Sequence, residues 1–325
     1  MQSGAYSMEK KMLKYILKRL ARSILTLLII VSIVFILMRK MPITGYFPNY
    51  DHMSQEAIAN GLHMMGLDLP VYQQLLLFLK GLITKGSLGV SYVYRNQVPV
   101  TEILSTKWPI SVKLGLLGQA LALLIGLPLG TVMAQHKGGW IDRLGTGFIV
   151  TIQALPAAVY FLLIQLYATE AFRLPLAFTY ENPKTWILPV FSLALPNIVY
   201  YAMWLRRYMV DESTKDYVKL CQIKGMSSRA IMFKHVFRNA FVPLGQYLPT
   251  TLLNTVVGSI YVESLYSIPG MGGLLVDVIK KQDNAMVQAI VMIFAAVGII
   301  GLILGDIMMS LLDPRISFTG KKGGR

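Results

Sequence analysis

The chain has 325 residues, of which 54% are hydrophobic and 14% are charged, and its formal net charge is +15. This composition lies far from the averages of soluble globular domains and excludes that class. Several strongly apolar segments are each long enough to cross about 30 Å of hydrocarbon as a helix.

Six apolar segments predict six transmembrane helices. They lie at about residues 20–38, 110–134, 144–167, 186–205, 242–261 and 285–312. We therefore expect an all-α membrane protein. Its expected parts are an interfacial helix and first span (1–38), a large outer loop (39–109), a core of five spans with a loop at 206–241 (110–312), and a cytoplasmic tail (313–325).

Positive charge is concentrated between alternate spans. With the N-terminus inside, the inner segments hold 20 of the 31 Lys and Arg residues; these segments are 1–22, 135–143, 206–241 and 313–325. This asymmetry predicts a multi-pass protein of the cell membrane with both termini in the cytoplasm. Topology and anionic membrane lipids explain the basic charge, so nucleic-acid binding is not expected.

The N-terminal stretch "MLKYILKRLARS" has an apolar face and a basic face at helical spacing. It predicts a short helix along the inner membrane surface before the first span, although a merely basic flank is an equal alternative. In the outer loop, "LPVYQQLLLFLKGLI" predicts a second amphipathic helix. Paired glycines four residues apart, Gly126 with Gly130 and Gly301 with Gly305, favour close helix packing within the chain.

The fifth apolar segment is the most polar of the six. Gln246 and Asn254 would be costly in contact with lipid, so we expect this helix to face protein or a water-filled path. Both residues are candidates for lining a pathway; equally, they could bond to neighbouring helices. Asp306 is the one acid in the sixth segment, and a bonded acid at a helix end is the favoured interpretation over a functional one.

Two segments between spans need separate explanations. The outer segment "VESLYSIPGMGGLLVDVIKKQDN" contains a proline and several glycines, which predict a re-entrant or capping segment. In the inner segment, residues 211–223 predict a short helix, Gly225 suits its C-terminus, and Ser227 or Ser228 suits the start of a second helix. We expect this loop to have no buried partner in its own chain and to dock on another protein, rather than to fold against the bundle.

Motifs for chemistry are missing from the sequence. There is no G-x-x-x-x-G-K-[ST] for ATP phosphates, and the four histidines show no metal-ligand spacing. An intramembrane hydrolase would need a buried constellation that the spans do not offer, and a pure scaffold would not need six spans. We expect a membrane protein that is not an enzyme and binds no cofactor or metal itself.

The inner loop "DYVKLCQIKGMSSRAIMFKHVFRNAFVPL" resembles the EAA loop of ABC-importer permeases, in the form found in the oligopeptide and dipeptide branch. The resemblance extends to "MLKYILKRL", "MGLDLPVYQQLLLFLKGLITKGSLGVSY", "IGLPLG", "GWIDRL", "SIYVESLYSIPGMGGLLVDVI" and "LLDPR", in that order along nearly the whole chain. The chain departs from the pattern where Lys219, Leu220 and Cys221 replace Glu-Ala-Ala, and where "MPITGYFPNY" replaces Pro-Gly-Asp-Pro.

The resemblance implies the type I permease fold and an ATP-driven importer of oligopeptides or dipeptides. It implies four kinds of partner: a second homologous permease, two cytoplasmic ATPases that hold ATP and Mg²⁺, an extracytoplasmic substrate-binding protein, and membrane lipids. The helix before Gly225 would couple the ATPases to the spans by alternating access, with contacts from Tyr217, Leu220, Cys221, Lys224 and Gly225. The same architecture could import nickel or other metal chelates, glutathione or oligosaccharides.

Overall fold

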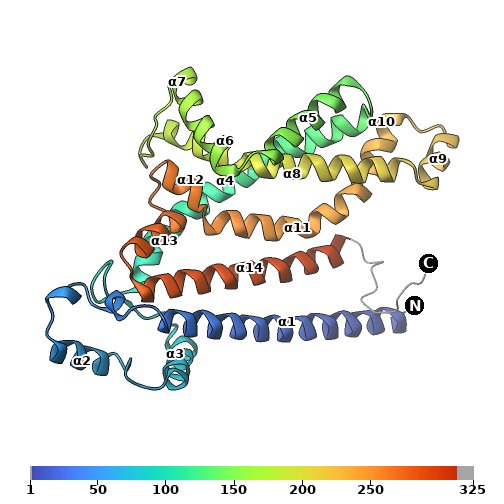
Figure 1. Ribbon diagram of the computed structural model, residues 1–325. Helices are drawn as coiled ribbons and strands as arrows, with labels where there is room; N and C mark the ends of the chain where they lie inside the picture. The colour runs from blue at the N-terminus through green and yellow to red at the C-terminus, as the bar shows by residue number, and fades with distance from the viewer. Residues whose placement is uncertain (1, 313–325) are drawn as a thin grey trace. The chain divides into compact units, whose positions relative to one another are not determined.

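The computed structural model describes residues 2–312 and is almost entirely helical (Figure 1). The chain divides into two compact units. One consists of Met1–Arg22, Lys113–Val256 and Ile300–Arg325, and the other of Ser23–Val112 and Val257–Ile299. Three long helices contribute at least one turn to both units: α1 (Gln2–Arg39), α4 (Val100–Gln135) and α14 (Asn284–Leu312). The predicted cytoplasmic tail, 313–325, lies outside the described residues.

The first unit is built around α8, whose buried face carries residues at helical spacing. Ala194, Ile198, Tyr201 and Leu205 of this helix belong to one hydrophobic cluster that includes Leu244 of α11. The other helices of this unit are short or bent. The elements are α5 (Trp140–Ala154), α6 (Ala157–Leu163), α7 (Thr169–Phe172), α8 (Ile187–Ser213), α9 (Asp216–Ile223), α10 (Ser228–Ile231) and α11 (Phe237–Val257), with a 3-10 turn at Pro183–Trp186 and π turns at Ile164–Ala168 and Met232–Val236.

The paired glycines pack helices within the chain, as their spacing predicts. A Cβ on Gly130 of α4 would lie 2.6 Å from the carbonyl oxygen of Ala202 in α8. A Cβ on Gly305 of α14 would lie 2.4 Å from the carbonyl oxygen of Gln246 in α11. Because only glycine allows backbones to approach so closely, these positions fix the seams between α4 and α8 and between α11 and α14.

The second unit confirms the predicted amphipathic helix as α3 (Val71–Lys85). Asp283, which is fully buried, accepts hydrogen bonds from Ser91 Oγ (2.6 Å), from the backbone N–H groups of Val93 and Tyr94, and from Met286 N–H in the first turn of α14. One carboxylate thus caps a helix and holds a loop. The remaining elements are α2 (Gln55–Met64), α12 (Ile260–Leu265), α13 (Met271–Lys280), the antiparallel pair β1 (Val90–Ser91) and β2 (Val98–Pro99), and 3-10 turns at Ile43–Tyr46 and Tyr50–His52.

The predicted spans need three corrections. α1 is one continuous helix, so the interfacial helix is not separated from the first span by a turn. α4 begins at Val100, ten residues before the predicted start at 110. The third span is not straight: Trp140–Ala154 and Ala157–Phe172 meet at 109°, because Pro156 holds Leu155 in an extended conformation (ψ 136°).

Length and apolarity identify fewer than six spans among the described residues. Four helices qualify, at Lys18–Arg39, Val100–Gln135, Pro183–Ser213 and Asn284–Met309, and the bent pair brings the number to five. The predicted fifth span forms α11 but does not qualify, since its polar residues and its two internal prolines, Pro243 and Pro249, lower its apolarity. Six spans therefore stay a prediction.

Candidate coupling and pathway residues

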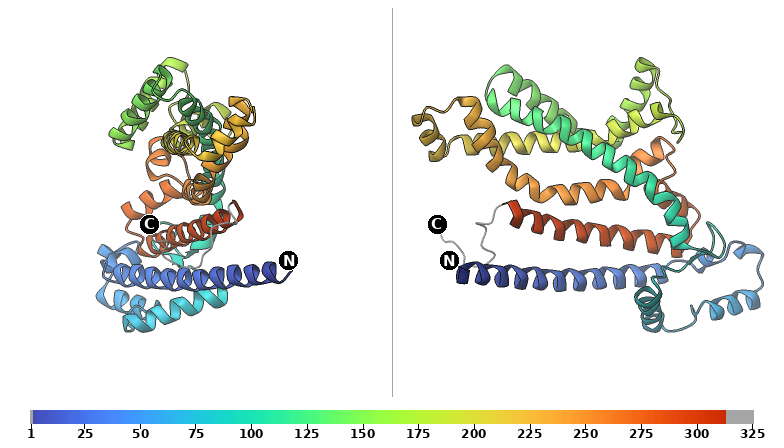
Figure 2. Two further views of the ribbon diagram at one scale, coloured as in Figure 1. Left: turned by 90° about the vertical axis from the view of Figure 1, so that its right-hand side faces the viewer. Right: turned by 180° about the vertical axis from the view of Figure 1, so that it is seen from behind.

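The inner loop folds as helix, glycine turn, helix, as its sequence predicts. α9 ends at Ile223 with Lys224 as its C-cap, and Gly225 follows with φ +75°, a conformation that glycine adopts without strain. Ser227 then caps α10 by accepting a hydrogen bond from Ala230 N–H at 3.3 Å, which decides between the two predicted serines. Both helices lie beyond the Ser213 end of α8 (Figures 1 and 2).

The loop is not free of its own chain, contrary to expectation. Val218 of α9, Ile231 of α10 and Val236 of the following π turn are buried in the cluster around α8. Tyr217 and Cys221 pack against the same cluster. Helical periodicity defines one apolar face, and the sequence could not show that α8 and α11 cover it.

The five predicted coupling residues therefore separate into two groups. Tyr217 and Cys221 are half-buried, whereas Leu220, Lys224 and Gly225 are exposed. The Tyr217 hydroxyl donates to Glu212 Oε2 at 2.8 Å, which links α9 to the last turn of α8. Burial, together with the neighbouring Glu212 carboxylate, raises the pKa of Tyr217, so its hydroxyl remains a donor at neutral pH.

The exposed tip of α9 carries two large apolar side chains. Leu220 is 52% exposed and Ile223 is 83% exposed, with the basic side chains of Lys219 and Lys224 beside them in the sequence. Ile223 is not among the five coupling residues that the sequence predicts, although its place three residues after Leu220 on a short helix is a usable signal. Apolar side chains exposed on a basic surface are typical of a protein-docking site.

The two candidate pathway residues lie in different environments. Gln246 is half-buried, and its Nε2 lies 3.5 Å from Asp306 Oδ1 of α14. Asp306 also pairs with Arg19 of α1, so this acid is bonded at the helix end. Asn254 is exposed on α11, as is Tyr247, which is 45% exposed.

A row of aromatic side chains adjoins this part of α11. Tyr200, Trp204 and Tyr208 follow each other at intervals of four residues on α8, and the ring of Tyr247 lies 6.2 Å from that of Tyr200. Tyr201 bridges two other helices, since its hydroxyl bonds both Gln119 Nε2 and Thr251 Oγ1, each at 2.5 Å. α8 and α11 together thus present polar and aromatic groups in a strongly apolar protein.

The segment after α11 is held by a buried carboxylate that the sequence did not reveal. Glu263 is fully buried in α12 and accepts hydrogen bonds from Ser111 Oγ (2.8 Å), Gly272 N–H (2.6 Å) and Gly273 N–H (3.1 Å). The carboxyl thereby caps the N-terminus of α13. Burial raises the pKa of Glu263 in spite of these bonds. The proline and glycines of this segment form the break between α12 and α13, in agreement with the predicted capping segment.

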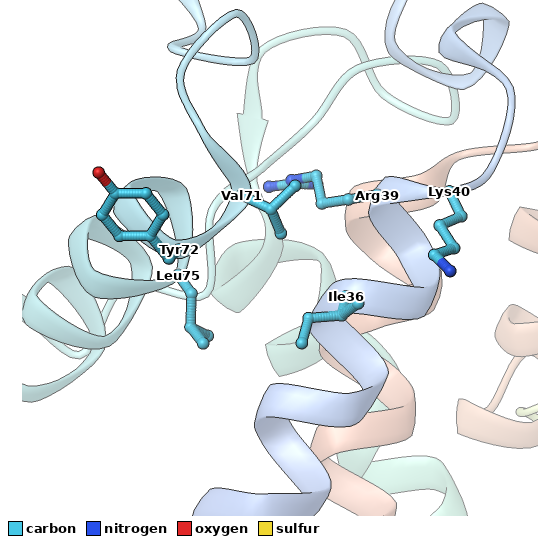
Figure 3. Close-up of a pocket in the computed structure, with 6 residues that line it drawn as sticks. All are labelled: Ile36, Arg39, Lys40, Val71, Tyr72 and Leu75. Atoms are coloured by element: carbon cyan, nitrogen blue, oxygen red, sulfur yellow. The ribbon is translucent and has the colours of Figure 1, made fainter.

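Figure 3 shows a cavity of about 300 Å³ between the end of α1 and the start of α3. Its walls are mainly apolar, and Arg39 beside it is already bonded to Gln74 Oε1 (2.7 Å) and to the Tyr46 hydroxyl. The lining residues are Ile36, Arg39, Lys40, Val71, Tyr72 and Leu75. Among the described residues, no group of three or more His, Cys, Asp or Glu is arranged to hold a metal ion.

Two family models match the chain. The model "Binding-protein-dependent transport system inner membrane component" matches residues 126–318, and the model of the N-terminal part of such components matches residues 12–115. The chain belongs to this family. It is thus a multi-pass inner-membrane permease of an ABC importer, and permease subunits of this family are transporter components without an ATPase domain. Permeases of this family work with ATPases and binding proteins.

Curated relatives of this family carry several transport names. The chain is 37% identical to "Oligopeptide transport system permease protein AmiC" of Streptococcus pneumoniae over 65% of its own length, but it spans only 43% of that protein. It is 31% identical to the dipeptide permease DppB of Bacillus subtilis, over 96% of this chain and 100% of that one. It is also 31% identical to the glutathione permease GsiC of Pectobacterium atrosepticum, over 94% and 100%.

Proposed function

We propose that this permease forms half of the translocation path of an ATP-driven importer of oligopeptides or dipeptides. A second, homologous permease supplies the other half, and an extracytoplasmic binding protein delivers the substrate. Two cytoplasmic ATPases hold ATP and Mg²⁺, and both termini of this chain lie on their side of the membrane. The main support for the cargo is the full-length similarity to a dipeptide permease, together with the oligopeptide permease match.

The exposed tip of α9 is the observation that carries the coupling role. Leu220 and Ile223 insert into a groove of an ATPase, Lys224 lies at the rim, and Gly225 sets the direction in which the chain returns. Tyr217 and Cys221 do not contact the ATPase; they hold α9 in place by packing against the hydrophobic cluster of α8 and α11. Closure of the ATPases on ATP displaces α9 and switches the spans between inward-open and outward-open arrangements.

In the half of the path that this chain forms, exposed groups of α11 line the path. Asn254 and Tyr247 are the candidates there, because a polar side chain in a membrane helix is costly against lipid. Gln246 contributes at the end nearer to Asp306, to which its amide is bonded.

Glutathione is a second candidate cargo, since a glutathione permease is equally similar over its full length. Uptake of a labelled pentapeptide and of labelled glutathione should be compared in source cells, in cells lacking this chain, and in cells with the chain restored. The proposal expects peptide uptake to disappear and return with the chain. If peptide uptake is unaffected while glutathione uptake disappears, the cargo assignment moves to glutathione.

A further inference from the structure

A partly buried ion pair joins the turn between α4 and α5 to the end of α8. Asp142 Oδ1 accepts from Arg206 Nε at 2.5 Å, and Oδ2 accepts from Arg206 Nη2 at 2.7 Å. Oδ2 also accepts the N–H of Gly138 at 2.8 Å. The Asp142 side chain is only 5% exposed and that of Arg206 is 30% exposed. A bidentate pair of this kind fixes orientation as well as distance.

The pair lies on the stem of the proposed coupling helix. Arg206 is two turns before the end of α8, and only Thr214 and Lys215 separate α8 from α9. Tyr217 and Glu212 bond α9 to that same last turn of α8. A displacement of α9 therefore reaches Arg206 through a short, continuous and hydrogen-bonded path.

Apolar packing already holds α4, α5 and α8 together next to the pair. Met133, Ile149, Val199 and Ala202 form a buried cluster of the three helices. Gly145 of α5 makes room for the Met133 side chain, since a Cβ there would lie 2.5 Å from its Sδ. Apolar contacts of this kind hold the helices together but are non-directional, so they do not orient the turn between α4 and α5 relative to the end of α8. The directional contacts at this edge come from the ion pair.

We infer that Asp142 and Arg206 are positioning residues for energy coupling: they make the turn between α4 and α5 move together with α8 when α9 is displaced. The inference rests on the proposed role of α9. It assigns to the pair a mechanical task rather than a contact with substrate, ATP or a partner. Loss of the pair should leave the helices packed but allow α8 to move without the turn.

The test uses the importer complex purified through a tag on this chain, as wild type and with Arg206→Met, Asp142→Asn, both changes, or Arg207→Met. Arg207 is the matched control, because it carries the same charge on the next residue but is exposed and stacks on Trp204 instead. The first measurement is amide hydrogen exchange at residues 136–145 with and without a non-hydrolysable ATP analogue. The second is the number of labelled pentapeptides imported per ATP hydrolysed in vesicles.

The inference expects the ATP analogue to change exchange at this turn in the wild type and in Arg207→Met but not in Arg206→Met. It expects Arg206→Met to lower the import ratio roughly tenfold while ATP hydrolysis continues. Asp142→Asn added to Arg206→Met should cause no further loss, because the two residues act as one unit. A wild-type exchange response in Arg206→Met would overturn the inference. So would additive losses of the import ratio in the double variant, or a lower yield of Arg206→Met complex with an unchanged import ratio.

The two measurements distinguish a wrong cargo from a wrong role of the ion pair. If the wild type imports no pentapeptide but its exchange response depends on Arg206, the ion pair retains its role and peptide is the wrong cargo. If the nucleotide leaves exchange at this turn unchanged in the wild type as well, the pair is not part of the coupling path.

Discussion

At the scale of single residues, sequence identified the glycine and the capping serine of the inner loop but not the direction of its side chains. Gly225 and a capping serine at 227 or 228 could be predicted because turn chemistry is local, and the structure selects Ser227. The inward packing of Tyr217 and Cys221 could not, since it depends on α8 and α11, which are adjacent in space only in the folded chain. Glu263 was missed for the same reason: its partners Ser111 and Gly272 lie elsewhere in the sequence.

Substitutions at Gly225 should show whether backbone conformation or side-chain size limits peptide uptake. No atom lies within 4 Å of a Cβ built there, so the cost of a substitution comes from the left-handed backbone, φ +75°. Gly225→Val should reduce peptide uptake at least roughly tenfold, whereas Gly225→Asn should retain most of it, because asparagine tolerates this conformation. Gly86→Val, at an equally open C-terminal position of α3 with φ +60°, is the control. Equal losses at both glycines would argue against a specific role of the loop.

Substitution of Glu263 should change stability and its dependence on pH. Glu263→Ala leaves the N–H groups of Gly272 and Gly273 without their acceptor and should cost about 2–4 kcal/mol, measured by thermal unfolding in detergent. Glu263→Gln should be better tolerated, because its amide oxygen accepts from the glycines and its amide nitrogen donates to Ser111.

The pH dependence follows from the raised pKa of Glu263. The folded protein holds this proton more tightly than the unfolded chain, whose ordinary value is 4.5. The resulting stabilisation is complete below about pH 4.5 and disappears as the pH rises through the folded-state pKa. Glu263→Gln should remove this part of the pH dependence; an unchanged pH profile in that variant would refute the assignment.

At the scale of helices, the glycine spacing correctly predicted that helices pack closely within the chain at these positions, but not which helices meet there. Gly130→Leu should destabilise the protein by about 1–3 kcal/mol or more, because its side chain would meet the backbone of Ala202 at the seam between α4 and α8. Gly147→Leu on α5 is the control, since a Cβ there meets no atom within 4 Å. Detergent-solubilised protein yield and thermal unfolding measure both variants; similar losses would show that the seam is not the cause.

Helix boundaries were less predictable than helix existence. Hydropathy located the apolar segments, but it does not report a bend, and Pro156 turned one expected span into two helices at 109°. Hydropathy also does not determine the residue at which a helix begins. α4 begins as early as Val100 because residues 100–104 pack against α13 and the start of α14 in a buried cluster. α11 is helical as expected, yet its polar content keeps it outside the apolar criterion for a span.

At the scale of the whole molecule, the charge asymmetry predicts the orientation. On a Cys221→Ser background, a cysteine at Met64, which is 87% exposed in the outer loop, should react with a membrane-impermeant maleimide in intact cells. A cysteine at Ile223, which is 83% exposed at the tip of α9, should react only after permeabilisation. The reverse labelling pattern would invert the topology and place the α9 tip away from the ATPases.

In the proposed mechanism, ATP hydrolysis drives peptide import through the exposed tip of α9. The most direct measurement is ATP-dependent accumulation of a labelled pentapeptide in vesicles that contain the purified complex. Wild type is compared with Leu220→Glu/Ile223→Glu and with Asp216→Asn, an exposed control on the same helix. We expect accumulation only with ATP, at the wild-type level in Asp216→Asn and lost in the double variant. Accumulation without ATP, or normal import by the double variant, would contradict it.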